Sequence, residues 1–284
     1  MSKAKAVFEG GVAVITGAGS GIGEGLARHA AALGMKVVLA DIASARIQAL
    51  AQELRAQGAE ALPVTTDVSD PAALDHLAQA ASASYGDIRL LVNNAGIETL
   101  GFTWEIPAAM WEKTLNINIH GAIHGVRAFA PRMLASGKPA YIANVASIGA
   151  LGMMPVQTSY ILSKHAILSF SESLYLEMQL KKAPVQVSAI LPGPVATRIF
   201  QDSETVPDPV VAHHREVMRG MLEAVGITPL EAARRIFEQI AAGEFWVSTH
   251  PDITAQMAQS RANHLSGLKT PELAAEIAAS VSLD

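Results

Sequence analysis

Short apolar segments alternate with helix-forming segments along most of this 284-residue chain. The apolar segments have the length of strands and end at polar or turn-forming residues, which is typical of strands buried on both faces. Strands that alternate with helices specify a parallel sheet covered by helices on both sides. We therefore predict an α/β fold with a doubly wound sheet of seven parallel strands, at residues 12–15, 36–40, 61–65, 90–92, 141–145, 185–191 and 245–247.

No linker or internal repeat divides this pattern, so residues 1–250 are expected to form a single domain. Helices are predicted at residues 21–33, 44–57, 72–85, 111–136, 159–182 and 229–242. The stretch at about 198–226 is polar and helix-prone, and we interpret it as a lid over a substrate site. Pro, Asn and Gly interrupt residues 251–284 before an Ala-rich segment. We expect this C-terminal extension to pack on the domain or on a neighbouring subunit.

The first strand is joined to the first helix by a glycine-rich loop, Gly17-Ala18-Gly19-Ser20-Gly21-Ile22-Gly23. Glycines allow the backbone to turn tightly and to approach a ligand closely. The helix N-terminus behind the loop offers free N–H groups and the positive end of a dipole, which suits a pyrophosphate. A strand, loop and helix in this order predict a Rossmann-type, dinucleotide-binding fold rather than a merely flexible turn.

Two acids follow the next two strands. Asp41 ends the second strand, where a carboxylate can accept hydrogen bonds from the adenosine ribose hydroxyls and would repel a 2′-phosphate. No Arg or Lys follows before Arg46, so NAD is favoured over NADP. Asp67, followed by Val68, ends the third strand and could bind the adenine amino group or cap the next helix.

Tyr160 and Lys164 lie four residues apart in a segment with helical periodicity, which puts both side chains on one helix face. A tyrosine titrates near pH 10 in water, and a nearby cation favours the phenolate and lowers that pKa. Such a tyrosine could exchange a proton with an alcohol or ketone oxygen. The pair alone is equally compatible with a solvated helix face.

The overall charge is acidic, with 21 basic and 26 acidic residues and a net charge of −5, which argues against a nucleic-acid partner. The absence of cysteine excludes disulfides and thiolate chemistry. No apolar run reaches membrane-spanning length, and the start lacks a signal-peptide pattern, so we expect a cytoplasmic protein. His213 and His214 lack a carboxylate at metal-binding spacing and are expected to be solvated, with no metal site.

Taken together, the motifs resemble those of the classical short-chain dehydrogenase/reductase family from residue 12 to about residue 248. The match begins with the glycine loop, includes Asn118 in the long helix, Ser147 after the fifth strand and the Tyr160–Lys164 pair, and covers two further segments, Asn93-Asn94-Ala95-Gly96 and Pro192-Gly193-Pro194-Val195-Ala196-Thr197.

The resemblance implies that Tyr160 transfers the proton, that Lys164 lowers its pKa and holds the nicotinamide ribose, and that Ser147 binds the substrate oxygen. It implies that Asn118 anchors a water that links Lys164 to solvent. The cofactor-binding residues expected on the combined grounds are Gly17, Ser20, Gly21, Ile22, Gly23, Asp41, Asp67, Val68, Asn94, Ala95, Gly96, Tyr160, Lys164, Pro192, Gly193, Val195 and Thr197.

The expected function is hydride transfer between NAD and a secondary alcohol or its ketone. Leu151, Met153, Met154, Pro155 and Phe200 indicate a roomy apolar pocket and hence a bulky substrate. Glu98 could reach the mouth of that pocket or face solvent. The alternatives are an NADP-dependent ketone reductase and a non-catalytic dinucleotide-binding regulator. The resemblance also implies a homotetramer or homodimer.

Overall fold

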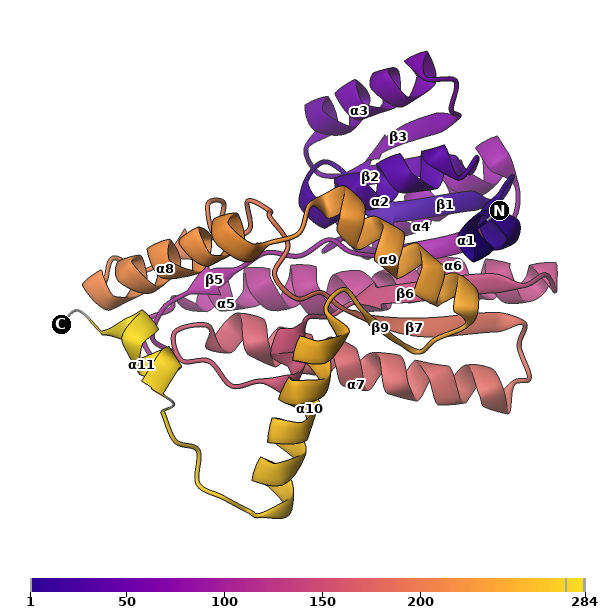
Figure 1. Cartoon of the computed structure of the whole chain (residues 1–284). Helices are drawn as coiled ribbons and strands as arrows, with labels where there is room; N and C mark the ends of the chain where they lie inside the picture. Colours follow the sequence, from indigo (N-terminus) through magenta and orange to yellow (C-terminus); the bar gives the residue numbers. More distant parts are fainter. Residues whose placement is uncertain (1, 274, 283–284) are drawn as a thin grey trace.

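Parallel strands form the central sheet, in the order β3-β2-β1-β4-β6-β7-β9 (Figure 1). The structure is a computed structural model and describes residues 2–273 and 275–282. The strands of this sheet are β1 (Val12–Thr16), β2 (Lys36–Asp41), β3 (Ala61–Thr65), β4 (Ile88–Asn93), β6 (Ala140–Val145), β7 (Val185–Leu191) and β9 (Trp246–Ser248). The predicted α/β fold of Rossmann type, with seven parallel strands, is therefore confirmed.

Helices cover both faces of the sheet, as the alternating sequence pattern predicts (Figure 1). Buried residues of α1, α2, α3 and α9 pack on one face, and those of α4, α6 and α7 pack on the other. The α-helices are α1 (Lys3–Phe8), α2 (Gly21–Ala32), α3 (Ser44–Ala56), α4 (Pro71–Tyr85), α5 (Ala108–Leu115), α6 (Gly121–Ser136), α7 (Thr158–Leu180), α8 (Pro209–Val225), α9 (Pro229–Ala242), α10 (Pro251–Ser266) and α11 (Ala275–Val281).

Successive residues of one strand serve opposite faces, which is why the strands are apolar throughout. Ala13 and Ile15 of β1 join the core beneath α2 and α9, whereas Val12 and Val14 join the core beneath α4 and α6. The alternation follows from the two-residue period of a strand. The strand order reverses between β1 and β4: from β1 the sheet continues through β2 to β3, and from β4 it continues through β6 to β7. Rossmann folds bind their ligands in the crevice at such a reversal.

Three local features differ from the sequence-based prediction. The first residues form the short helix α1, anchored by the fully buried Phe8, whose ring lies 5.1 Å from Tyr141 and 5.4 Å from Phe237 between ring centres. The long predicted helix is split, because a π-helical turn, Asn116–His120, separates α5 from α6. A small second sheet joins β5 (Thr99–Leu100) to β8 (Glu204–Thr205) in the lid segment.

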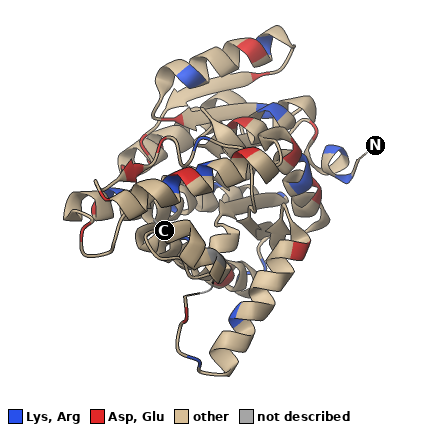
Figure 2. Ribbon diagram, turned by 60° about the vertical axis from the view of Figure 1, so that its left-hand side comes forward, with Lys and Arg blue, Asp and Glu red and all other residues tan. Residues whose placement is uncertain are grey.

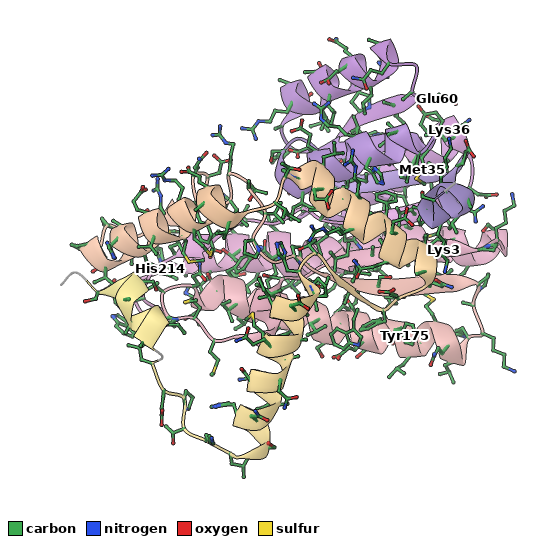
Figure 3. The ribbon with its side chains drawn as sticks, in the orientation of Figure 1. Lys3, Met35, Lys36, Glu60, Tyr175 and His214 are labelled. Carbon is green, nitrogen blue, oxygen red and sulfur yellow. The ribbon has the colours of Figure 1, made fainter. Side chains whose placement is uncertain are left out.

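The segment predicted to be a lid contains β8 and α8, and the C-terminal helix α11 lies against α8 (Figure 1). His214 of α8 is fully buried at this contact, where Figure 3 labels it. Its Nδ1 lies 3.2 Å from Ser280 Oγ and 3.3 Å from the Ser280 carbonyl oxygen. The prediction that His214 is solvated was wrong, because α11 covers this face of α8; its neighbour His213 is half-buried.

Charged side chains of both signs are interspersed along the helices that Figure 2 brings into view. Arg28 illustrates the pattern, since its guanidinium pairs with Glu24 of the same helix and with Glu53 of α3. Exposed pairs of this kind contribute little to stability. Within residues 2–273 and 275–282, no helix combines the length and apolar character needed to cross a bilayer.

Candidate active site

The loops at the carboxyl ends of β1, β2, β3, β4, β6 and β7 surround one cavity of about 610 Å³. Because all these strands are parallel, their carboxyl ends meet along one edge of the sheet. Every residue predicted to bind cofactor except Gly23 lines this cavity, as do the predicted catalytic residues Ser147, Tyr160 and Lys164. Asn118 does not line it and lies just behind the wall.

The glycine loop is held in shape by close backbone contacts that a side chain would prevent. A Cβ on Gly23 would stand 2.0 Å from the Gly17 carbonyl oxygen, and Gly17 itself has a positive φ of 65°. The Asn94 side chain braces the same loop, since its Nδ2 donates to the Thr16 carbonyl at 2.8 Å. Asn94 thus shapes the cradle, while the N-terminus of α2 presents its free N–H groups there. The loop fits a pyrophosphate.

Asp41 at the end of β2 is held in place by two backbone N–H groups. Its Oδ2 accepts from Gly19 at 2.9 Å, and its Oδ1 accepts from Ala43 at 2.8 Å. Each carboxylate oxygen keeps further acceptor capacity toward the cavity that it lines. This arrangement fits the ribose hydroxyls of a bound dinucleotide.

Asp67 does not cap the next helix, so one of the two predicted alternatives is excluded. The N-cap of α4 is Asp70, whose Oδ1 accepts from the Ala72 N–H at 2.9 Å. Asp67 instead forms a turn with Ser69, accepting from its N–H at 2.9 Å and from its hydroxyl at 2.6 Å. Asp67 and Val68 both line the cavity, where the adenine end of a dinucleotide would lie.

Tyr160, Ser147 and Lys164 all line the cavity. The Ser147 side chain hydrogen-bonds the Tyr160 side chain, and its Oγ also accepts from the Gly149 N–H at 3.0 Å. Lys164 Nζ lies 5.3 Å from the centre of the Tyr160 ring and donates to the Val145 carbonyl at 3.1 Å. The prediction that Tyr160 and Lys164 share a helix face holds, and the alternative of a solvated face is excluded.

The direction of the Tyr160 pKa differs from the prediction. Burial raises the pKa of Tyr160, Glu98 raises it further, and only the hydrogen bond from Ser147 lowers it. Burial also lowers the pKa of Lys164 to about 8, so this amine is still mostly protonated at pH 7 but loses its charge just above neutral pH. The sequence-based argument counted the cation and left out the cost of burying the charges.

Asn118 lies in the π-helical turn between α5 and α6, and this turn directs its side chain at the strand-end loop. Its Oδ1 accepts from the Ile97 N–H at 2.8 Å and its Nδ2 donates to the Ile97 carbonyl at 2.9 Å. The same Nδ2 lies 3.0 Å from Ser163 Oγ on α7. Asn118 therefore ties the loop after β4 to the helix that carries Tyr160 and Lys164. π-Turns are frequent at functional sites.

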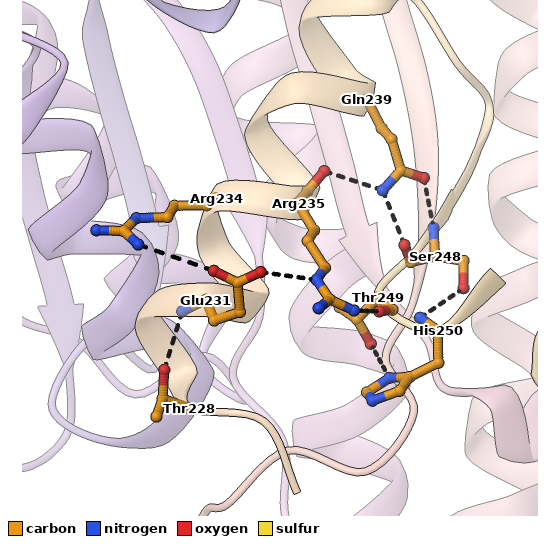
Figure 4. Close-up of polar contacts among 8 residues, drawn as sticks. All are labelled: Thr228, Glu231, Arg234, Arg235, Gln239, Ser248, Thr249 and His250. Atoms are coloured by element: carbon orange, nitrogen blue, oxygen red, sulfur yellow. Dashed lines mark hydrogen bonds and ion pairs between the residues drawn. The ribbon is translucent and has the colours of Figure 1, made fainter.

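The loop after β7 is fixed by a hydrogen-bond network that starts on α9, and Figure 4 shows its part from α9 to Thr249. Glu231 binds Arg235 Nε at 2.9 Å, and Arg235 Nη1 donates to the Thr249 carbonyl at 2.7 Å. The buried Thr249 Oγ1 in turn accepts from the Gly193 N–H at 2.9 Å. This link was not foreseen, because nothing local in the sequence pairs residue 249 with residue 193.

The remaining part of the cavity is strongly apolar. Met153 and Met154 line it as predicted, together with Met218 and Met221 of α8. Met257 comes from α10, so the C-terminal extension contributes to the wall. No pattern in the sequence points to Met257, because α10 lies far along the chain from every motif. Met218 and Met221 lie three residues apart on α8, so helical periodicity alone could have placed both on one helix face.

Glu98 occupies neither of its two predicted positions. It is buried in the cavity wall rather than at the mouth or in solvent, and its Oε1 has no hydrogen-bond partner in the part of the chain that the structure describes. Burial raises the pKa of Glu98 well above its usual range, although Lys164 nearby opposes the shift. Glu98 is thus a carboxyl group close to Lys164 that favours its neutral form.

The sequence profile of the family described as short chain dehydrogenase matches residues 11–207. The chain belongs to this family. Short-chain dehydrogenases bind NAD(P), and relatives named as dehydrogenases match over most of the chain. The protein is accordingly an NAD(P)-dependent oxidoreductase of the alcohol dehydrogenase type.

Individual relatives of this short-chain dehydrogenase come from several bacteria. A 1-deoxy-11-beta-hydroxypentalenate dehydrogenase of Streptomyces avermitilis is 33% identical over 253 residues, 86% of each chain. A CLA biosynthesis dehydrogenase/reductase of Lactiplantibacillus plantarum is 31% identical, covering 86% of this chain and 90% of the relative. A solved short-chain dehydrogenase/reductase from Burkholderia phymatum, in complex with NAD, has a TM-score of 0.89 and 36% identity over 94% of this chain and 98% of the other.

Proposed function

We propose that this short-chain dehydrogenase transfers a hydride between NAD and a bulky, apolar secondary alcohol or its ketone. The observation that carries the proposal is the meeting of Tyr160, Ser147 and Lys164 at one end of a cavity whose other end fits a dinucleotide. Nicotinamide, when bound, supplies the hydride acceptor or donor at C4. The proton transfer and the positioning of the substrate are carried out by side chains of this protein.

Tyr160 takes the proton of the alcohol during oxidation and returns it during reduction. Ser147, which hydrogen-bonds Tyr160, orients the substrate oxygen and stabilises the charge that develops there. Lys164 holds the nicotinamide ribose hydroxyls and provides positive charge beside the Tyr160 ring. Because burial and the nearby Glu98 both raise the pKa of Tyr160, proton transfer requires that charge. Asn118 anchors a water that links Lys164 to solvent.

NAD is the proposed cofactor because of Asp41. A carboxylate there accepts hydrogen bonds from ribose hydroxyls and would lie against a 2′-phosphate of NADP. The relative in complex with NAD supports this choice. One observation favours NADP as the second candidate: the Arg46 side chain is near, its Cβ 3.3 Å from where a Cβ on Gly19 would be.

A bulky apolar substrate is supported by the methionines of the cavity, since thioether side chains adapt to large apolar shapes. We further propose a cytoplasmic homotetramer or homodimer with a lid at residues 198–226. The exposed Leu162, Leu176 and Leu180 on α7 favour contact with another subunit. Size-exclusion chromatography with light scattering tests the assembly, and a monomer at micromolar concentration would contradict it.

The reaction is tested by following NADH formation with a panel of secondary alcohols. The wild type should turn over at least one bulky member, and Tyr160→Phe should lose about 100-fold or more of its kcat while still binding NADH. Tyr175→Phe is the matched control, because Tyr175 lies on the same helix with its ring against Phe245, 5.2 Å between ring centres (Figure 3). Full activity of Tyr160→Phe would refute the mechanism.

A further inference from the structure

Two buried polar side chains interrupt the apolar wall of the substrate cavity. Glu98 is 2% exposed; its carboxyl has a backbone hydrogen bond from Thr99, but its Oε1 has no hydrogen-bond partner among the described residues. Gln157 is 4% exposed, and its amide forms no hydrogen bond with any residue in the described part of the chain. Buried polar atoms are nearly always hydrogen-bonded, so a buried carboxyl oxygen without a partner, in the same cavity as an amide that is free to bind, calls for a ligand group.

The two side chains come from segments that run side by side. The Gly101 N–H donates to the Val156 carbonyl at 2.8 Å, and Ser159 Oγ donates to the Thr99 carbonyl at 3.3 Å. Glu98 immediately precedes Thr99, and Gln157 lies between Val156 and Ser159, the two residues of its segment that form these bonds. Both line the same cavity as Tyr160, which lies on α7 three residues after Gln157.

Gln157 is not explained by a structural role. It occupies the N-cap of α7, yet its side chain makes no capping hydrogen bond. The preceding Val156 is buried with a φ of +55°, a left-handed conformation that a β-branched residue rarely adopts. Strain of this kind persists mainly where the surrounding structure serves a site. Here it turns the chain at the point where Gln157 enters the cavity wall.

The surroundings restrict what the pair can bind. Lys164 interacts electrostatically with Glu98, so a cationic amine would be repelled by Lys164. An anionic group would instead meet the carboxyl of Glu98. A neutral hydroxyl carries no charge that would conflict with Lys164 or with the Glu98 carboxyl. It can donate a hydrogen bond to one member of the pair and accept one from the other.

From this geometry we infer that Glu98 and Gln157 form a polar subsite for a second hydroxyl group of the substrate, next to the carbon that is oxidised. The substrate class is then a vicinal diol, or the corresponding hydroxyketone, on an otherwise bulky and apolar skeleton. This inference rests on the proposed alcohol dehydrogenase function. Glu98 and Gln157 act as specificity-determining residues, separate from the proton transfer at Tyr160.

Two probe alcohols that differ by one hydroxyl test the subsite: methyl phenyl carbinol and phenyl ethylene glycol. The wild type should show a kcat/KM for the diol at least about tenfold above that for the carbinol. Gln157→Leu and Glu98→Leu should abolish this preference, whereas Glu98→Gln, which keeps hydrogen-bonding atoms, should retain it. Met153→Leu is the control, because it alters the cavity wall without a hydrogen-bonding group and should shift both substrates alike.

Several outcomes separate this inference from the proposed function. Turnover of both alcohols with equal efficiency would leave the dehydrogenase function standing and overturn the subsite. Equal losses on both alcohols in Gln157→Leu would also overturn it. If Glu98→Leu fails to fold, Gln157→Leu decides alone. If neither alcohol is oxidised, calorimetric titration of the NADH-bound protein with both still decides, since the subsite predicts at least about tenfold tighter binding of the diol.

Discussion

The carboxylate of Asp41 accepts a hydrogen bond from the backbone N–H of Gly19, with 2.9 Å between the two atoms. The acid at the end of β2 and the glycine loop after β1 are therefore parts of one structure. Asp41 has two separable effects, which are to fix the shape of the loop and to present acceptors to a ribose. A substitution at Asp41 should change cofactor affinity as well as cofactor choice.

The first prediction concerns the choice of cofactor. The wild type should use NAD with a kcat/KM at least about 100-fold above that for NADP, because a 2′-phosphate would lie against the Asp41 carboxylate. Asp41→Ala should lower kcat/KM for NAD by roughly tenfold, through lost hydrogen bonds to ribose and loop. It should also raise activity with NADP, helped by the nearby Arg46. Steady-state kinetics with both cofactors measure these values.

The matched control for this prediction is Asp87→Ala. Asp87 is exposed and pairs with Lys138 before β4, at the opposite edge of the sheet from the cofactor loops. Its removal changes the net charge by the same amount but should leave the ratio of NAD to NADP efficiency unchanged. Preference of the wild type for NADP would show that Asp41 does not select the cofactor.

The second prediction concerns stability and Lys164. Burial lowers its pKa from 10.5 to about 8, and the pKa of Glu98 is shifted toward the neutral form as well. Both groups thus lose more by burial than they gain from each other. Lys164→Met should therefore stabilise the cofactor-free protein at pH 7, by roughly 1–3 kcal/mol, while abolishing activity. Denaturant unfolding measures the free energy.

The pH dependence of this gain has a defined sign. Between about pH 8 and 10.5 the unfolded chain holds a proton on Lys164 that the folded protein has released. Wild-type stability from this group therefore rises with pH across that window, and the advantage of Lys164→Met shrinks. Lys138→Met, at an exposed lysine, should show no such trend. A gain that stays constant from pH 7 to 10 would contradict the assignment.

The third prediction concerns the loop after β7. Thr249→Val removes the acceptor of the Gly193 N–H and leaves this half-buried backbone donor without its partner. Because this loop is proposed to hold the nicotinamide, we expect the KM for NAD to rise and kcat/KM to fall about tenfold. Thr254→Val is the control, since Thr254 Oγ1 binds Ser248 Oγ at 2.7 Å and does not reach the loop. Equal effects of the two variants on KM and kcat/KM would show that Thr249 has no specific role in cofactor binding.

Much of the fold follows from local patterns. Strands buried on both faces, such as Val12–Thr16, are recognisable because they are almost wholly apolar. The helix ends at Gly34, Gly137 and Gly243 follow from glycines with positive φ. The loops at strand ends could be placed together because parallel strands share one edge. These rules placed the glycine loop, Asp41 and Ser147 around one cavity.

What the sequence could not provide depends on long-range packing. The π-turn at Asn118 arises within a segment that reads as one continuous helix. The burial of Tyr160 is the main reason why its pKa moves opposite to the expected direction, and Glu98, buried near the place where β5 and α7 meet, adds to that shift. Met257 reaches the cavity only because of the path that the C-terminal extension takes. The same path brings Ser280 to His214 on α8.

The last prediction concerns the contact between the lid helix α8 and α11. Ser280 Oγ donates to the Ile277 carbonyl, so His214 Nδ1 must carry the proton that faces the Ser280 oxygens. His214 Nε2 is buried without a partner among the described residues. Burial lowers the pKa of His214 below 6.5, so below that pH the unfolded chain takes up a proton that the folded protein resists. Acid should therefore weaken this contact.

His214→Asn keeps an N–H donor near the Nδ1 position and removes the titration. The wild type should lose stability relative to this variant as the pH falls from 6.5 to 5, because the unfolded state binds more protons there. Thermal melts over this range measure the difference, and hydrogen exchange of α11 locates it. His213→Asn is the control, at the half-buried neighbour. Parallel pH profiles for the wild type and His214→Asn would show that His214 does not titrate at the contact of α8 with α11.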